Sequence, residues 1–116
     1  MTTIDWRYHR NGCTTCKRAE AFLDSQKIST KAIIDARKDP LQPSDALKLA
    51  RSCHTLFVTK GTKVLEFDLK KEKLDDEELQ RLLIGPSGKL RAPAIRVKKT
   101  LIVGFHPEMM QRALNV

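Results

Sequence analysis

Several features that mark other protein classes are scarce in this sequence. It has three cysteines, whereas a small secreted protein stapled by disulfides normally pairs its cysteines and so has an even number. No stretch approaches the ~20 consecutive apolar residues that a membrane-spanning helix needs. The N-terminal segment, with Trp6, Arg7 and Tyr8, is too polar for a signal peptide. We therefore expect a protein of the reducing cytoplasm that has no membrane partner.

The sequence also lacks internal repeats, low-complexity tracts and linkers rich in Pro, Gly or Ser. Its 116 residues are enough for one domain and leave little room for a second, so we expect a single domain over residues 1–116, acting as a monomer. Acidic residues are outnumbered: 14 Asp and Glu stand against 22 Lys and Arg, for a net charge of +8, which favours acidic partners. The basic residues form no stripe interleaved with aromatic side chains, so we expect no direct binding of nucleic acid.

The hydrophobic periodicity divides the chain into alternating strands and helices. The middle segment, 55–69, fits either a β-hairpin around Gly61 or a partly helical insertion. The order of elements predicts an α/β fold, with a mixed sheet of about four strands flanked by helices and a partly helical central insertion. The predicted strands are residues 4–8, 31–35, 94–97 and 100–103, and the predicted helices are 14–26, 44–51, 76–84 and 107–114.

The helix after the middle segment has the clearest boundaries. Asp75 can cap its N-terminus with Glu78 three residues on, as in a capping box, and Gly85 and Pro86 stop it. Pro107 stands where a last helix can begin, because proline is favoured in the first helical turn. These signals predict two further helix starts within the second half of the chain.

Cys13 and Cys16 form a C-x-x-C pair at the junction of the first predicted strand and the first predicted helix. In that position the sulfur of Cys13 lies near unsatisfied backbone N–H groups and the positive end of the helix dipole, which stabilise a thiolate. No Asp or Glu lies between Asp5 and Glu20. The basic residues of the same segment are Arg7, Arg10, Lys17 and Arg18. We expect Cys13 to be the catalytic nucleophile.

Cys16 lies about one helical turn further on, on the apolar face with Ala19. A thiol there is shielded from solvent yet within reach of Cys13, so we expect Cys16 to displace the mixed disulfide that Cys13 forms with a substrate. The alternative is a zinc site. Zinc in structural sites normally takes four ligands, and the other candidates, Cys53 and His54, are adjacent and awkward as a pair. We therefore expect no metal, and Cys53 to be a small buried hydrophobe.

Five segments spread over nearly the whole chain form a combination that is far more specific than the cysteine pair alone. They are 12–19 (GCTTCKRA), 35–40 (DARKDP), 74–79 (LDDEEL), 91–95 (RAPAI) and 103–105 (VGF). In this combination the chain resembles the glutaredoxin-like arsenate reductase (ArsC/Spx) family.

The resemblance implies a thioredoxin-like fold in which Pro93 is a cis-proline facing the two cysteines. It also implies that Ala92, before that proline, offers backbone hydrogen bonds to a bound substrate. We expect Thr14 and Thr15, between the cysteines, and Arg91 to bind substrate together with Ala92 and Pro93. We expect no tightly bound cofactor, with glutathione or another thiol reductant as the cosubstrate.

The leading function is that of a thiol–disulfide oxidoreductase, which reduces disulfides or glutathione mixed disulfides and attracts an anionic thiol substrate through Arg91 and nearby lysines. One alternative is an Spx-like redox-sensing regulator that binds RNA polymerase. The other is arsenate reductase. Typical arsenate reductases of the family have a single active cysteine and an arginine directly before the proline, where this chain has Ala92. Lys60 and Lys63 stand where an oxyanion-binding arginine is expected, and lysine lacks the planar fork of arginine, so arsenate reduction ranks below general dithiol exchange.

Overall fold

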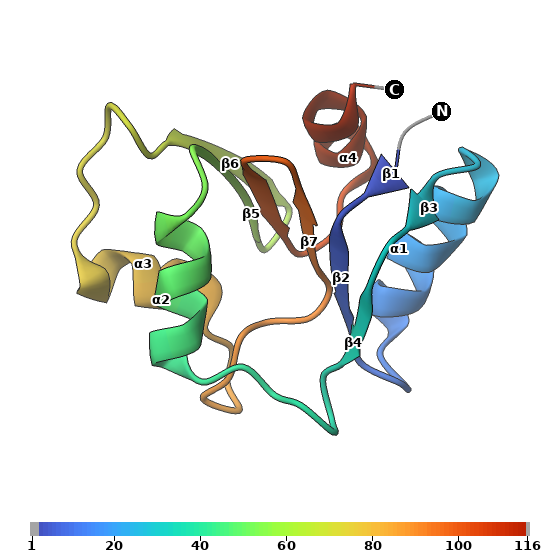
Figure 1. Ribbon diagram of the computed structural model, residues 1–116, viewed down its shortest axis with the longest axis horizontal. Coiled ribbons are helices and arrows are strands. Elements are labelled where there is room, and N and C mark those ends of the chain that lie inside the picture. Colours follow the sequence, from blue (N-terminus) through green and yellow to red (C-terminus); the bar gives the residue numbers. More distant parts are fainter. Residues whose placement is uncertain (1–2, 116) are drawn as a thin grey trace.

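A mixed six-stranded sheet forms the centre of the fold in the computed structural model, which describes residues 3–115 (Figure 1). Across the sheet the strands are β4 (Ile33–Asp35), β2 (Trp6–His9), β7 (Ala94–Val97), β8 (Thr100–Val103), β5 (Thr55–Lys60) and β6 (Lys63–Asp68). Two short strands, β1 (Thr3–Ile4) and β3 (Ser29–Thr30), pair with each other in parallel. The helices are α1 (Thr14–Ser25), α2 (Pro43–Arg51), α3 (Asp76–Leu83) and α4 (Pro107–Leu114).

The predicted fold class, a mixed sheet flanked by helices, is confirmed. β2 and β4, which α1 connects, are parallel, as the strand–helix–strand order predicted. β7 and β8 are antiparallel and joined across Lys98 and Lys99. The sheet has six strands in place of about four, because the middle segment contributes two more.

The middle segment, 55–69, is the β5–β6 hairpin, so the partly helical interpretation of this segment is wrong. The two strands pair antiparallel from Thr55 opposite Asp68 to Lys60 opposite Lys63, and Gly61 takes a φ of 62° in the turn between them. β5 lies between β8 and β6 and is buried on both faces. Its apolar side chains therefore run continuously, without the alternation that identifies a strand from sequence. The helical parts of the central region are α2 and α3, on either side of the hairpin.

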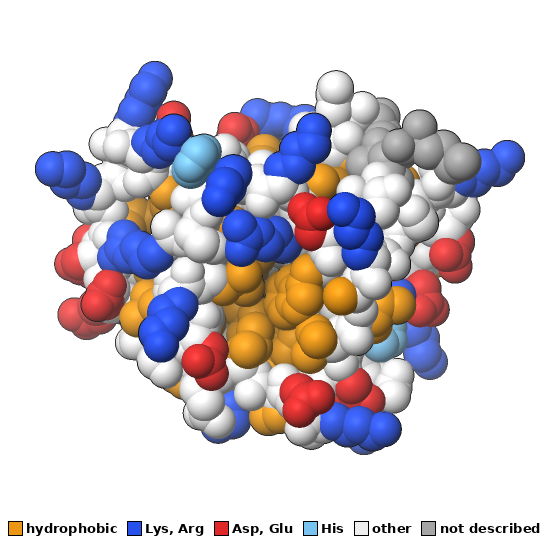
Figure 2. All heavy atoms as spheres, in the orientation of Figure 1, with side chains coloured by type: hydrophobic (Ala, Val, Ile, Leu, Met, Phe, Trp, Pro, Cys, Tyr) orange, Lys and Arg blue, Asp and Glu red, His pale blue; other side chains and the backbone are white. Residues whose placement is uncertain are grey.

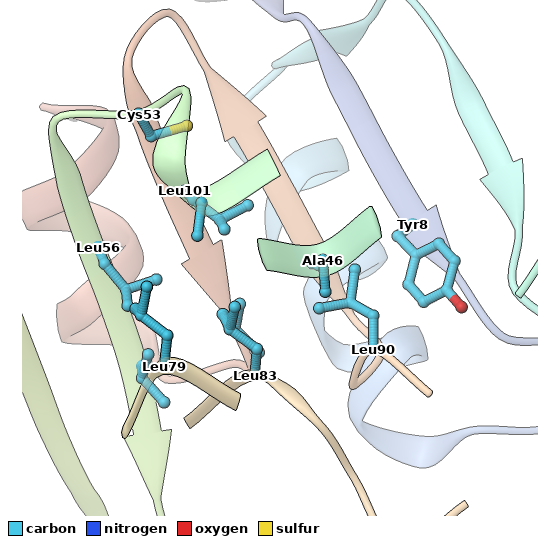
Figure 3. Close-up of a cluster of buried hydrophobic side chains, with 12 residues drawn as sticks. Tyr8, Ala46, Cys53, Leu56, Leu79, Leu83, Leu90 and Leu101 are labelled. Atoms are coloured by element: carbon cyan, nitrogen blue, oxygen red, sulfur yellow. The ribbon is translucent and has the colours of Figure 1, made fainter. Parts of the chain in front are cut away.

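The helices cover the sheet in two pairs, one on each face. α2 and α3 pack on one face in a core that extends from Cys53 to Tyr8 (Figure 3). α1 and α4 pack on the other face through Leu23, Met109 and Met110. Successive residues of β8 enter opposite cores, because side chains alternate across a strand. Both faces of the sheet are thus buried over most of its width.

The helix boundaries agree with the predicted capping residues. The carboxylate of Asp75 accepts the N–H of Glu78 at 2.8 Å, so α3 begins where its capping box predicted. α4 begins at Pro107, also as predicted, whereas α2 begins at Pro43, one residue earlier than predicted. Within residues 3–115 no helix has the length and the apolar character that crossing a bilayer requires.

Candidate active site

Cys13 is the N-cap residue of α1, at the point where the chain leaves β2 and turns into the helix. Its backbone is extended, and its Sγ accepts the N–H of Cys16 at 3.3 Å. Backbone N–H groups at a helix N-terminus bind anions, and the helix dipole adds to their effect. The residue is partly exposed. The predicted position of Cys13 at the start of the first helix is therefore confirmed, in a residue that is partly exposed.

Cys16 is fully buried in the first turn of the same helix, on the side that faces the sheet. Burial, together with a hydrogen bond to Cys13 and the charge of Cys13, raises the pKa of the Cys16 thiol to about 12. A backbone hydrogen bond with Arg10 and the positive charge of Arg7 act in the opposite direction on this pKa. The two cysteines thus offer one accessible sulfur and one protected sulfur in direct contact.

Three strand ends meet at the edge of the sheet beside Cys13. β2 and β4 are parallel and β7 is antiparallel to β2, so the carboxyl ends of the first two and the amino end of the third share this edge. The phenol oxygen of Tyr8 accepts the N–H of Leu41 at 3.0 Å, and the C=O of Leu41 accepts the N–H of Leu90 at 3.0 Å. These bonds tie the segment after β4 to the segment before β7, at the same end of the strands as Cys13.

A groove of about 690 Å³ lies between these segments and Cys13. This volume is within the range of small-molecule sites, roughly 300–1,000 Å³. The groove has apolar lining, which includes Pro40, Leu90 and Ala92, and none of its lining residues is Asp or Glu. Its basic lining residues are Arg10, Arg37, Lys89 and Arg91. On the face shown in Figure 2, apolar side chains gather in a hollow, and both basic and acidic side chains stand around it. The charge of the groove suits an anionic ligand.

Arg37 brings its guanidinium close to Gly12, the residue before Cys13. One of its terminal nitrogens lies 3.6 Å from the position that a Cβ on Gly12 would occupy, next to Cys13 in the chain. Asp35 fixes the turn that carries it, because its Oδ1 accepts the N–H of Arg37 at 2.9 Å and that of Lys38 at 3.3 Å. These bonds, with the two nearby positive charges, lower the pKa of Asp35. The carboxylate is therefore ionised at neutral pH.

The structure brings only some of the predicted substrate-binding residues to the groove. Ala92 lines it, and the Ala92–Pro93 peptide bond is cis, as the resemblance implied. Thr14 and Thr15 lie in the first turn of α1, outside the groove lining. Pro93 is buried behind Ala92. That any of these residues binds substrate stays a prediction.

Arg91 contributes to the groove, but its guanidinium is engaged elsewhere. Its Nη1 donates to the backbone oxygen of Thr59 at 2.8 Å, and its Nη2 donates to Oγ1 of the same residue at 3.1 Å. Burial lowers the pKa of Arg91. The cation that the sequence analysis did not assign to the site is Arg37, whereas Lys89 is one of the lysines near Arg91 that it expected there. Arg37 could have been found from its place at the end of the strand in segment 35–40.

Cys53 lies apart from the cysteine pair, in the core under α2 and α3 (Figure 3). It is buried, as predicted, two residues beyond the end of α2, and burial raises the pKa of its thiol. Among residues 3–115, no three side chains of His, Cys, Asp or Glu are grouped so that they could hold a metal ion.

Comparisons with known proteins bear on the family and the fold of the chain. A family model described as "ArsC family" matches residues 8–113. SACOL0876 from Staphylococcus aureus is similar in structure, with a TM-score of 0.59, 23% identity, and coverage of 95% of this chain and 98% of that one. The YFFB protein (PA3664) has a TM-score of 0.55 and 20% identity, with coverage of 94% and 97%. At these identities the solved structures show a shared fold. Comparison with curated proteins gave no match.

Proposed function

The chain belongs to the ArsC family and has a thiol-based redox role, and on this premise we propose that it is a thiol–disulfide oxidoreductase whose reacting groups are Cys13 and Cys16. One observation carries the proposal. The two sulfurs differ sharply in environment although they are one helical turn apart: Cys13 is partly exposed at the helix N-terminus, and Cys16 is buried with a thiol pKa of about 12. Two-step disulfide exchange needs such an accessible attacking thiol and a protected second thiol.

The reaction follows from these two positions. The thiolate of Cys13 attacks one sulfur of a substrate disulfide, so a bond forms between Cys13 and the substrate while the substrate S–S bond breaks. The first substrate thiolate leaves with the electron pair and takes a proton from solvent. Cys16 then loses its proton and attacks the Sγ of Cys13, which forms the Cys13–Cys16 disulfide and releases the second substrate thiolate. The substrate gains two electrons, and the dithiol loses them.

Restoring the dithiol needs a thiol reductant, and we propose glutathione or a similar thiol as this cosubstrate, with no tightly bound cofactor. The groove supports an anionic substrate, either a glutathione mixed disulfide or a protein disulfide with acidic neighbours. Because the guanidinium of Arg91 is held by Thr59, the attraction falls mainly to Arg10, Arg37 and Lys89. We place this activity in the cytoplasm, in a monomeric protein.

The test is the reduction of a glutathione mixed disulfide and of a peptide disulfide by single-cysteine variants. We expect Cys13→Ser to lose both activities by at least ~100-fold, because it lacks the nucleophile. Cys16→Ser should keep turnover of the glutathione mixed disulfide, which needs one thiol, and lose reduction of the peptide disulfide. Cys53→Ser is the matched control and should keep both activities. Full activity of Cys13→Ser would refute the proposal.

The same dithiol suits an Spx-like redox switch that gates binding to RNA polymerase, and the net charge of +8 favours an acidic partner surface. Such a regulator would show no turnover with any thiol donor. It would instead retain RNA polymerase in only one redox state, and the Cys13→Ser variant would lose that dependence. Consumption of thiol that depends on arsenate would point to the third function, arsenate reduction.

A further inference from the structure

A buried arginine lies under the helix that carries the two cysteines. Arg7 is on β2 and is only 7% exposed. Its Nη1 lies 3.5 Å from Oε2 of Glu20 on α1, a long contact to a side chain that is itself 48% exposed. Among residues 3–115, its buried Nε has no hydrogen-bond partner. Because charged groups are rarely buried unless they are well paired, this weakly compensated guanidinium needs a reason.

Arg7 lies close to Cys16 through the geometry of α1. Cys16 and Glu20 are four residues apart on this helix, so their side chains are neighbours on one face. Arg7 contacts the second of them, which places its positive charge within about one helical turn of the buried sulfur. His9, two residues further along β2, presents a second buried and unpartnered nitrogen, Nδ1. The sheet surface under the dithiol is therefore polar and incompletely paired.

The second step of the exchange places a negative charge where burial opposes it. Cys16 has to be a thiolate when it attacks Cys13, and desolvation is the largest cause that keeps its thiol protonated. Arg7 is the cation whose charge acts against that effect. Glu20 is its counter-charge and reduces the effect of Arg7 on the sulfur.

We propose that Arg7 is a positioning residue for the resolving step, and that its buried guanidinium stabilises the negative charge on Cys16 while Cys16 attacks the Cys13 mixed disulfide. This role rests on the proposed dithiol function. Through Arg7, β2 would take part in a reaction whose reacting groups, Cys13 and Cys16, both lie at the start of α1. It also explains why a guanidinium with a single long ion pair is kept in the interior.

The test follows the two thiols separately, in a Cys53→Ser background, by mixing reduced protein with 5,5′-dithiobis(2-nitrobenzoate). Attack of Cys13 releases one thionitrobenzoate and leaves the other bound to Cys13. Attack of Cys16 on Cys13 then forms the internal disulfide and releases the second, while the proton of Cys16 goes to solvent. We expect Arg7→Met, which keeps most of the apolar stem, to slow the second release about three- to tenfold and to leave the first unchanged. A tenfold loss of thiolate is partly offset by the higher nucleophilicity of a more basic sulfur.

Two further variants separate charge from packing. Arg7→Lys keeps the charge and should restore most of the rate of the second release. Glu20→Gln removes the counter-charge and should give a second release at least as fast as that of the parent protein. Equal second-release rates in Arg7→Met and the parent would overturn the proposal, as would equal slowing in Arg7→Met and Glu20→Gln. If the parent itself releases no second thionitrobenzoate, Cys16 does not resolve the mixed disulfide, and the dithiol function fails together with the role of Arg7.

Discussion

The contrast between the two active-site thiols predicts a large difference in the reactivity of Cys16 between folded and unfolded protein. The perturbation is a double variant, Cys13→Ser with Cys53→Ser, in which Cys16 is the remaining cysteine. Burial is the largest cause of its raised pKa and persists in this variant, although the contribution of Cys13 is removed. The reactivity of Cys16 with an alkylating reagent then reports how strongly the fold protects this one sulfur.

The magnitude follows from the fraction of thiolate. At a pH of about 8, a pKa of about 12 leaves roughly one Cys16 in 10⁴ ionised, against roughly one in four for a free cysteine of pKa about 8.5. A more basic thiolate is more nucleophilic, by roughly 30-fold for this difference with a Brønsted coefficient of about 0.4–0.5. The expected net effect is an alkylation rate on the order of 100-fold below that of an unprotected cysteine, and somewhat less without the charge of Cys13.

The assay is the rate of alkylation by iodoacetamide, followed by mass spectrometry, in native buffer and again in a denaturant that unfolds the chain. The same cysteine thus serves as its own control, because unfolding removes the burial and leaves the chemistry unchanged. The partner variant, Cys16→Ser with Cys53→Ser, leaves only Cys13 and should be alkylated rapidly in the folded protein. If Cys16 in the folded variant reacts within tenfold of its rate in denaturant, the assignment of a protected resolving thiol is wrong.

Three further predictions concern the charge of the groove, the packing at Gly104 and the loss of stability at alkaline pH. Arg37→Gln should lower kcat/KM for a glutathione mixed disulfide about tenfold at low salt by removing a charged contact. It should leave a neutral disulfide unaffected, and the neighbouring Lys38→Gln is the control; equal loss on both substrates would contradict this reasoning. Gly104→Ala should cost about 2–4 kcal/mol of unfolding free energy in a denaturant titration, because Gly104 has a φ of 95° and its new Cβ would clash with Oγ1 of Thr59 on β5. An unfolding free energy equal to that of the parent protein would show that β5 and the residue after β8 can separate to admit the methyl group. Since the pKa of Cys16 is raised on folding, its contribution to stability is complete below the pKa of the unfolded thiol and is lost as pH rises from about 8.5 toward about 12. The midpoint temperature of thermal unfolding should therefore fall less steeply with pH over that range in Cys16→Ala than in the parent protein. Parallel declines in the two proteins would refute the raised pKa of Cys16.

The sequence by itself determined the features that depend on neighbouring residues. The strand, turn and helix around Cys13 span few residues, and the N-cap contact that defines the site joins positions 13 and 16. Asp75 and Pro107 fixed two helix starts for the same reason, since a cap acts within a few residues of the backbone groups that it satisfies. The resemblance then supplied the fold and the cis bond before Pro93, which no local pattern could have indicated.

The tertiary structure decided what depends on residues that are distant in sequence. β5 is buried on both faces, so its side chains carry no alternation, and only its pairing with β6 and β8 identified the hairpin. The guanidinium of Arg91 turns to Thr59, 32 positions away, although Arg91 lines the groove beside Cys13. Arg7 meets Glu20 only because α1 folds back over β2. A local pattern reports which side chains share a face, whereas the partner that a charged group finds across the core depends on how the elements pack.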